Sequence, residues 1–197
     1  MASGTATATA SYALRFGSGR ICLDLLTTTH PEERLDSADR LRAWITGSGL
    51  VPPGTPLTGV DAGWLRAFRE LREHVGLLVG GELDGRPADG ALIRVNAAAR
   101  GAPPAPCAVR TEDGALVRRL RALPTCEDLL AAVAREAIEL LTDPKARASL
   151  RRCEGDNCPI VYLDTSRGRR RRWCSSEVCG NRERVARHRR RAALTRT

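Results

Sequence analysis

Four cysteines in the last quarter of the 197-residue chain constrain its fold more than any other feature. Cys153 and Cys158 form one C-x4-C pair, Cys174 and Cys179 form a second, and fifteen residues separate the pairs. Two close thiol pairs at this distance can meet as one tetrahedral thiolate site, which suits structural Zn²⁺ and leaves no open position for catalysis. Disulfide bonds, a metal-free cluster, and His188 in place of one cysteine are the alternatives.

Local signals around each pair predict how it is held. The first pair encloses Gly155, Asp156 and Asn157, which favour a tight turn, and residues 159–163 (PIVYL) are β-prone. The second pair precedes a helical stretch that runs to about Ala193, and Ser175 is a candidate N-cap. We therefore expect a hairpin that carries the first pair and a helix start that carries the second, an arrangement typical of treble-clef zinc fingers.

The charge of the chain is concentrated in the same region. The net charge is +9, yet residues 1–144 carry 16 Arg/Lys against 18 Asp/Glu, whereas residues 145–197 carry 16 against 5. A concentrated field of arginines attracts polyanions, and nucleic acid is the commonest such partner. An acidic protein and an anionic membrane surface are weaker candidates.

The candidate nucleic-acid contacts fall into two groups. One group is a run between the hairpin and Trp173, and the other lies on the C-terminal helix together with Arg189. Val178, Val185 and Ala192 share one side of that helix, so we expect this side to pack on the zinc core while the arginines face the polyanion. Trp173 is expected to cover the metal core. The full set of candidate contacts is Arg167, Arg169, Arg170, Arg171, Arg172, Arg182, Arg184, Arg187, Arg190 and Arg191.

The rest of the chain predicts a mainly α-helical fold with small β elements. Residues 1–11 are expected to be disordered, residues 12–145 to form a mostly helical domain, and residues 146–194 to form the zinc finger, with the boundary near 143–150. A short strand is expected over 14–16, and either a helix or a strand over 21–26. Helix starts are expected at Asp36 or Ser37, Asp61, Pro87, Thr125 and Pro144, and a hairpin around Asp113-Gly114.

Other classes of function find little support in the sequence. The residues His30, His74, Asp24 and Asp36 form no recognisable catalytic motif, so we expect no enzyme. No secretory signal and no membrane-length apolar run are visible, which favours a cytoplasmic, nucleoid-associated protein whose other cysteines, Cys22, Cys107 and Cys126, are small buried hydrophobes.

Two further partners are left open by the sequence. A small-molecule effector could bind the N-terminal domain, although no residue identifies it. A homodimer could form through the 127–142 helix, although its apolar stripe is equally expected of a core helix.

Three short segments resemble a known finger. Residues 164–167 (DTSR), 172–175 (RWCS) and 179–182 (CGNR) resemble the CGNR zinc finger, and RFGSGRICLDLLTT resembles the start of the ABATE domain that usually precedes it. The helices that carry Leu41, Trp44 and Asn96 fit that domain more loosely. The resemblance implies a bacterial stress-induced transcription regulator that binds zinc through its four cysteines and contacts double-stranded DNA. An RNA-binding or ribosome-associated factor that uses the same module is the alternative.

Overall fold

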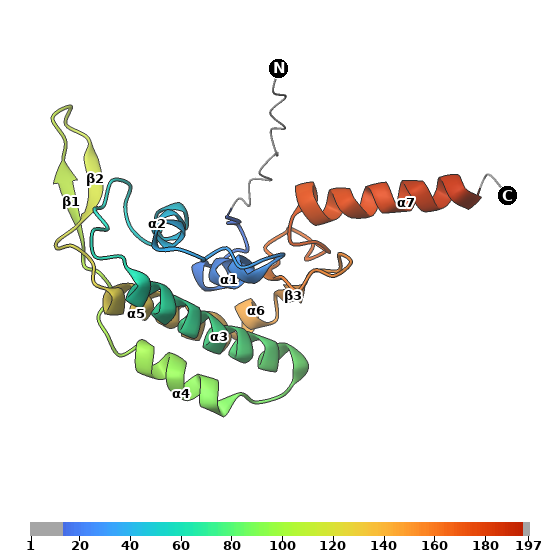
Figure 1. Cartoon of the computed structure of the whole chain (residues 1–197), viewed down its shortest axis with the longest axis horizontal. Coiled ribbons are helices and arrows are strands. Elements are labelled where there is room, and N and C mark those ends of the chain that lie inside the picture. The colour runs from blue at the N-terminus through green and yellow to red at the C-terminus, as the bar shows by residue number, and fades with distance from the viewer. Residues whose placement is uncertain (1–13, 195–197) are drawn as a thin grey trace, which may run out of the picture.

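The computed structural model describes residues 14–194, with side chains as far as residue 191. The N-terminal segment predicted to be disordered, 1–11, lies outside the described residues. As predicted, the chain is mainly helical with two small antiparallel hairpins. Figure 1 shows a helical body from which α7 (Asn181–Leu194) projects at one end and the hairpin of β1 (Pro106–Arg110) and β2 (Leu116–Leu120) projects at the other. Within this described part, no helix is long and apolar enough to cross a membrane.

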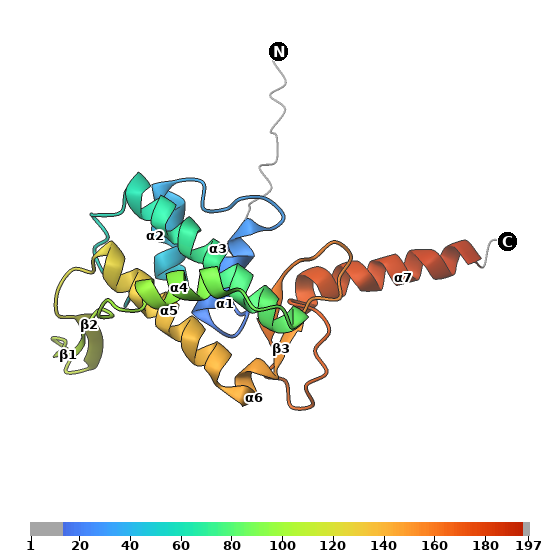
Figure 2. The ribbon, with the colours of Figure 1, turned by 90° about the horizontal axis from the view of Figure 1, so that it is seen from below.

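The body is organised around the long helix α3 (Ala62–Asp84). Asp61 caps its start by accepting a hydrogen bond from the N–H of Trp64 at 2.9 Å, and Gly85 ends it in the left-handed conformation at φ +65°. Phe68 and Val75 lie fully buried on its apolar stripe. Among the described elements, four helices contact it: α1 (Ile21–Leu26), α2 (Ala38–Gly47), α4 (Asp89–Ala98) and α5 (Cys126–Thr142) (Figure 2).

Helix α5 begins where the sequence predicted and packs inward. Thr125 and Asp128 form a reciprocal capping box, in which each side chain accepts a hydrogen bond from the other residue's backbone N–H. The apolar stripe of α5, which includes Leu129, Val133 and Leu140, is fully buried in the main core. This stripe therefore does not form a surface on which a second copy of the chain could dock.

Two N-terminal helices complete the core. Ser37 caps α2 (Ala38–Gly47), and its Trp44 ring meets the Phe68 ring edge-on at 5.8 Å. The segment that the sequence left open between helix and strand is helix α1, whose Cys22 N–H donates to Glu136 Oε2 of α5 at 2.7 Å. The 3₁₀ turn η1 (Thr27–Thr29) follows. The strand expected over residues 14–16 is wrong, because these residues have no regular structure.

A second hairpin links the helical body to the cysteines. After α6 (Pro144–Arg147), β3 (Leu150–Arg152) pairs antiparallel with β4 (Val161–Leu163). Successive side chains of a strand point to opposite faces. Leu150, Val161 and Leu163 are only 2–7% exposed and close the main core, whereas the fully buried Tyr162 packs among the cysteines. The main core therefore extends across the boundary expected near residues 143–150.

The N-terminal segment meets this hairpin at a tight backbone contact. The Ser18 carbonyl accepts a hydrogen bond from the Leu163 N–H at 2.8 Å, and Gly19 follows with φ +94°. A Cβ at Gly19 would lie 2.9 Å from the Leu163 Cβ, closer than real Cβ atoms approach. The site thus requires glycine for both its backbone conformation and its lack of a side chain.

Changing Gly19 to alanine is expected to destabilise the protein by about 1–3 kcal/mol, because the new methyl group adds a clash to backbone strain. Gly17 provides a matched control, since it also has positive φ but an added Cβ would meet nothing within 4 Å. Denaturant unfolding of both variants separates the two effects. Equal losses of unfolding free energy in Gly17→Ala and Gly19→Ala would show that the clash with Leu163 contributes nothing to the destabilisation.

Candidate metal centre and arginine-rich surface

The four predicted cysteines converge at one point. Their sulfurs all lie within 4.8 Å of one another, and the Sγ of Cys174 lies 3.7 Å from that of Cys158 and 3.6 Å from that of Cys179. Cys153 and Cys158 flank the loop between β3 and β4, and the second pair lies on the segment that enters α7. His188 is exposed on α7 and is not part of the cluster.

This geometry fits one tetrahedral zinc ion. With Zn–S bonds of about 2.3 Å, the sulfurs of a tetrahedral site lie about 3.8 Å apart. The two close sulfur distances, 3.6 and 3.7 Å, are near this value. Four thiolates complete the coordination shell, so an ion bound here is structural: it contributes folding energy and has no open position for a substrate.

Local backbone features hold the sulfurs at this spacing. A Cβ on Gly155 would lie 3.1 Å from the Cys179 Cβ and 3.3 Å from its sulfur, so a larger residue there would push against the second pair. Asn157 has a left-handed φ of +56°, which asparagine tolerates better than most residues. Ser175 accepts a hydrogen bond from the Val178 N–H at 3.2 Å, which confirms it as the cap of η2 (Ser176–Gly180).

Backbone amides prepare one sulfur for a cation. Burial raises the pKa of the Cys153 thiol, but N–H donors from Cys174, at 3.2 Å, and Gly155, at 3.4 Å, together with hydrogen bonds from the Cys158 and Cys174 thiols, more than offset it, so its pKa lies below the ordinary value. Burial raises the pKa of Cys158 to about 11. A bound cation reverses such a shift, since a coordinating thiol is deprotonated.

Two family models match the chain on either side of α6. The ABATE model, described as "Putative stress-induced transcription regulator", covers residues 19–144, and the CGNR zinc finger model covers residues 149–192. The chain belongs to the ABATE family. Its C-terminal part is a CGNR zinc finger, and the four-cysteine cluster is the metal centre of that finger. No curated protein matches the chain.

The CGNR finger has a small core of its own around the metal centre. Tyr162 is fully buried against Cys153 and Cys179, and Trp173 and Val178 pack at its edge. The Tyr162 hydroxyl donates a hydrogen bond to the Arg171 carbonyl. Trp173 thus covers the metal core, as expected.

Arg171 turns inward and stabilises this core. Its guanidinium lies 4.5 Å above the Tyr162 ring, and its nitrogens donate to the carbonyls of Trp173, at 2.8 Å, and Cys174. These contacts occupy much of the guanidinium, so we expect Arg171 to stabilise the finger core more than it contacts nucleic acid. The sequence of the arginine run does not distinguish Arg171 from its neighbours in this way.

Four other candidate arginines also have partners within the protein. Arg172 pairs with Glu154 and lies over the Trp173 ring, and Arg190 pairs with Glu183 at 2.7 Å. Arg184 donates to the carbonyls of Gly180 and Ser176, both at 3.3 Å. Arg182 reaches the Asp156 carbonyl at 3.5 Å and so links α7 to the first ligand loop. Unlike Arg171, all four remain exposed.

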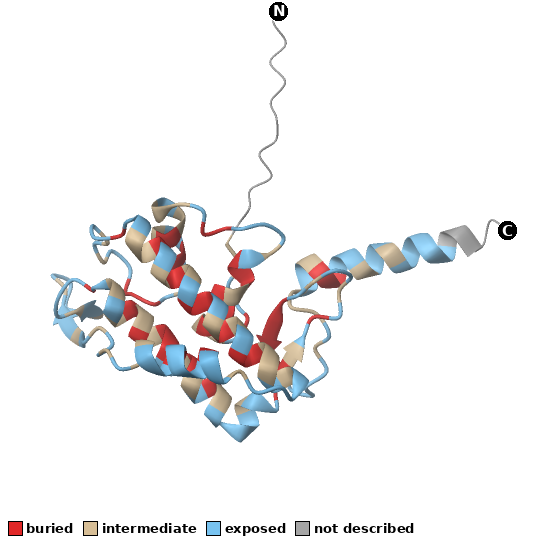
Figure 3. Cartoon of the chain, turned by 60° about the horizontal axis from the view of Figure 1, so that its bottom comes forward, coloured by how far each residue is buried: buried red, intermediate tan, exposed pale blue. Residues whose placement is uncertain are grey.

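Further exposed arginines lie in two places. One group is on the loop after β4, and the other is on α7, where Arg189 joins the residues predicted from sequence. Figure 3 shows that α7 is exposed over most of its described length, and the buried residues next to it, Cys179 and Gly180, belong to η2. These exposed side chains are Arg167, Arg169, Arg170, Arg187, Arg189 and Arg191.

The packing predicted for one side of α7 is wrong. Val178 packs against the finger core, but Val185 is 43% exposed, and the side chain of Ala192 lies outside the described residues. The helix leaves the body after its first turn and projects outward (Figure 1), so its apolar side has no core beneath it. Residues 187–191 of α7 are consequently all exposed.

Sequence reasoning missed the residue that organises the arginine loop. Asp164 is 2% exposed, and its carboxylate accepts hydrogen bonds from the N–H groups of Ser166, at 2.9 Å, and Arg171, at 3.1 Å. The hydrogen bond with Ser166 lowers the pKa of Asp164 and keeps it ionised. The sequence signal for this role was the spacing of Asp164 and Ser166, which is typical of an Asx turn.

Of the polar residues considered for catalysis, Asp24 is buried and Asp36 is exposed. Asp24 is buried and accepts a hydrogen bond from the Ser18 N–H at 2.7 Å, which fixes the N-terminal turn. Asp36 is exposed beside the cap of α2. Among the scattered cysteines, Cys22 is fully buried as expected, whereas Cys107 and Cys126 are only partly buried.

Proposed function

We propose that the protein is a zinc-dependent regulator whose CGNR finger binds double-stranded DNA. The observation that carries the proposal is a projecting helix with exposed arginines along its length, rooted in a metal centre that fixes its direction. Arginine pairs its planar fork with phosphate oxygens and with the O6 and N7 atoms of guanine. A nearby loop carries Arg167, Arg169 and Arg170, which would contact the phosphate backbone of the DNA beside the groove.

The dimensions of α7 suit the major groove. Its 14 residues correspond to a rod about 21 Å long and about 10–12 Å in diameter, and the major groove, about 12 Å wide, admits one such helix. Because residues 187–191 are all exposed, some of these side chains can reach base edges while others contact the phosphates that flank the groove. The excess of cations in residues 145–197 would draw the finger toward the duplex before these contacts form.

Duplex DNA is favoured over single-stranded RNA by the placement of the finger's aromatic rings. Recognition of unpaired bases uses exposed aromatic faces. Tyr162 is fully buried beneath Arg171, and Trp173 is partly buried beneath Arg172, so neither ring presents a free face. Competition of unlabelled RNA against a labelled duplex tests this preference, and stronger competition by RNA than by DNA would contradict it.

Replacing Arg187 and Arg189 together by alanine is expected to weaken duplex binding without loss of zinc. Each phosphate contact contributes about 0.9 to the slope of log K against log salt, or about fivefold in affinity at 0.15 M salt. The double variant should therefore bind roughly 20- to 30-fold more weakly, with a slope smaller by about 2. Fluorescence anisotropy across a salt series, using randomised duplexes, measures both quantities.

A charge-matched control separates local contacts from net charge. Arg118 on the distant β2 strand and Arg121 just after it are exposed, and their double alanine variant loses the same two charges. We expect this control to bind nearly as well as the parent protein. Equal weakening of the two double variants would show that α7 is not the contact surface.

A further inference from the structure

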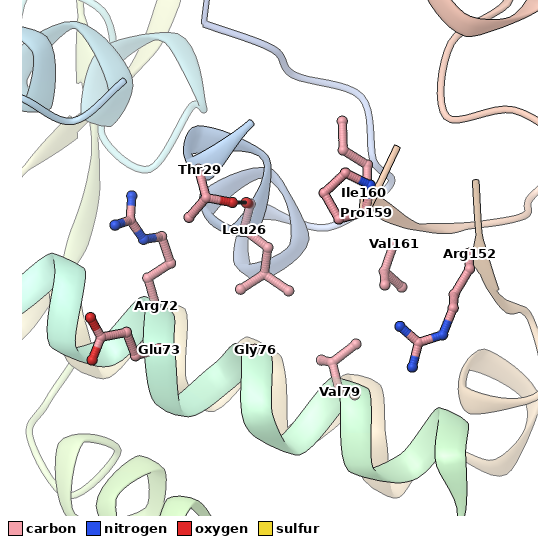
Figure 4. A pocket seen from close by; sticks show the side chains of 11 residues that line it. Leu26, Thr29, Arg72, Glu73, Gly76, Val79, Arg152, Pro159, Ile160 and Val161 are labelled. Atoms are coloured by element: carbon pink, nitrogen blue, oxygen red, sulfur yellow. Dashed lines mark hydrogen bonds between the residues drawn. The ribbon is translucent and has the colours of Figure 1, made fainter. Parts of the chain in front are cut away.

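The β1–β2 hairpin projects from the helical body (Figure 1), and among the described residues its sheet has only these two strands. Two-stranded hairpins are marginally stable in water unless a third strand or a helix covers them. The other hairpin is covered: Val161 of β4 is 7% exposed and lines a hollow against α3 with Leu26 and Val79 (Figure 4). By contrast, Leu116 of β2 is 65% exposed and Val109 of β1 is 45% exposed. The β1–β2 hairpin therefore presents apolar side chains to solvent.

The register of this hairpin shows which backbone groups point outward. Opposed residues of an antiparallel pair alternate between those that hydrogen-bond to each other and those whose N–H and C=O groups point away from the partner strand. The Thr111 N–H donates to the Ala115 carbonyl at 2.8 Å. The Arg121 N–H donates to the Ala105 carbonyl at 3.1 Å. Both bonds lie in the same register, so odd-numbered residues bond across the hairpin and even-numbered residues direct their N–H and C=O groups outward.

The outer edge of β2 is the more complete of the two free edges. Its outward backbone groups belong to Leu116, Arg118 and Leu120, and none of these groups makes a hydrogen bond with another described residue. On β1 the first outward residue is Pro106, which has no N–H to donate. A free edge of this kind is a template for pairing with another strand. Among the described residues, β2 thus offers the better docking edge.

The side chains along this edge select what can pair with it. Leu116, Arg118 and Leu120 lie on one face of the hairpin, since alternate residues of a strand point the same way. The Arg118 side chain is exposed and has no hydrogen bond or ion pair with another described residue. Arg119 lies on the other face and donates to the Pro53 carbonyl at 3.2 Å. The unpaired cation at the centre of the edge favours a carboxylate opposite it.

A second copy of the chain matches this edge poorly. Antiparallel pairing of β2 with β2 of another copy along its full length would place Arg118 opposite Arg118 and Leu116 opposite Leu120. Like charges directly opposite each other are destabilising. Exposed charges are one of the means by which proteins prevent edge-to-edge association of identical copies. The arginine that opposes self-pairing would attract a strand of opposite charge.

We propose that the β2 edge binds an extended acidic segment of another protein as a third strand of this sheet. A carboxylate of that segment would lie opposite Arg118, and apolar side chains two residues to either side would contact Leu116 and Leu120. The backbone of the segment would pair with the outward N–H and C=O groups of β2, which is the recognition mode called strand addition. The surface lies at the opposite end of the molecule from α7 (Figure 1), so the inference does not depend on the proposed DNA binding.

Peptide titration of the zinc-loaded full chain tests this surface without DNA. The probe is the labelled peptide TLTETLT, which reads the same in both directions and therefore fits a parallel or an antiparallel added strand. We expect saturable binding in fluorescence anisotropy. Bound peptide should slow hydrogen exchange at the amides of Leu116, Arg118 and Leu120, because these N–H groups gain acceptors. The outward amides of Ala108 and Arg110 on β1 should keep their exchange rates.

Reversing one charge on each side provides the decisive comparison. The parent chain should bind TLTETLT about 2- to 30-fold more tightly than TLTKTLT, in which lysine replaces the central glutamate. Arg118→Glu should reverse this preference, because its carboxylate attracts the lysine and repels the glutamate. Arg94→Glu is the matched control: Arg94 is also exposed, but it lies on α4 and carries the same change in net charge. It should keep the preference of the parent chain.

The outcomes separate this inference from its alternatives. Zinc content and circular dichroism establish that both variants fold. Absence of saturable peptide binding, protection of β1 amides in place of those on β2, or an unchanged preference in Arg118→Glu would overturn the assignment. Self-association of the parent chain in sedimentation, with the same β2 amides protected without peptide, would identify a second copy as the occupant and also overturn it. Binding of TLTETLT by a chain that binds no duplex would support this surface and reject only the proposed DNA contact.

Discussion

Changing Cys174 to serine is expected to weaken zinc binding by about two orders of magnitude and to weaken DNA binding with it. Apparent zinc-binding energies of about 10–16 kcal/mol in small fingers, shared among four thiolates, correspond to roughly 3 kcal/mol for each ligand, or about two orders of magnitude in affinity. Among the described residues, Tyr162, Trp173 and Val178 are the apolar side chains that pack with the four cysteines, so the finger core has little else to hold it. Elemental analysis and anisotropy with a labelled duplex measure the two losses.

A control at another cysteine distinguishes loss of the metal centre from the general effect of losing a thiol. Cys107 is partly buried on β1, far from the cluster, and Cys107→Ser should retain both zinc and DNA binding. Removing zinc from the parent protein with a chelator should reproduce the Cys174→Ser result, and restoring zinc should reverse it. Full duplex binding by metal-free protein would refute the zinc-dependent function.

A chain that ends at residue 148 is expected not to fold stably, although it contains the whole segment matched by the ABATE model. It lacks Leu150, Val161 and Leu163, which close the main core from the hairpin. Three such side chains contribute about 1.5–3 kcal/mol each, or roughly 5–9 kcal/mol together. Because whole domains are stable by only about 5–15 kcal/mol, this loss approaches the total.

A longer truncation serves as the control for this prediction. A chain that ends at residue 186 keeps the hairpin, all four cysteines and the contacts that Arg182 and Arg184 make, and loses only the outer part of α7. We expect it to unfold cooperatively at nearly the temperature of the full chain and to bind zinc, but to bind DNA weakly. A cooperative thermal transition in the chain ending at 148 would show that the helical body folds without the finger.

Much of the fold and the metal ligands could be predicted from the sequence because the signals were local. The caps at Ser37, Asp61 and Thr125 each act within three residues, and the apolar stripes of α3 and α5 report a helical period directly. The spacing of the four cysteines favoured one shared metal site over other arrangements, and the structure confirms that their sulfurs converge. The strand expected over 14–16 failed because two alternating residues carry little information about pairing.

The sequence by itself determined which residues can hold a zinc ion and where the positive charge lies, because both follow from residue types and short spacings. Only the tertiary structure decided what each side chain faces. Arg171 packs on Tyr162 while neighbouring arginines stay exposed, Val185 finds no core beneath it, and β4 is shared between the metal centre and the helical body. These outcomes depend on contacts between segments far apart in the chain, and local periodicity contains no information about such contacts.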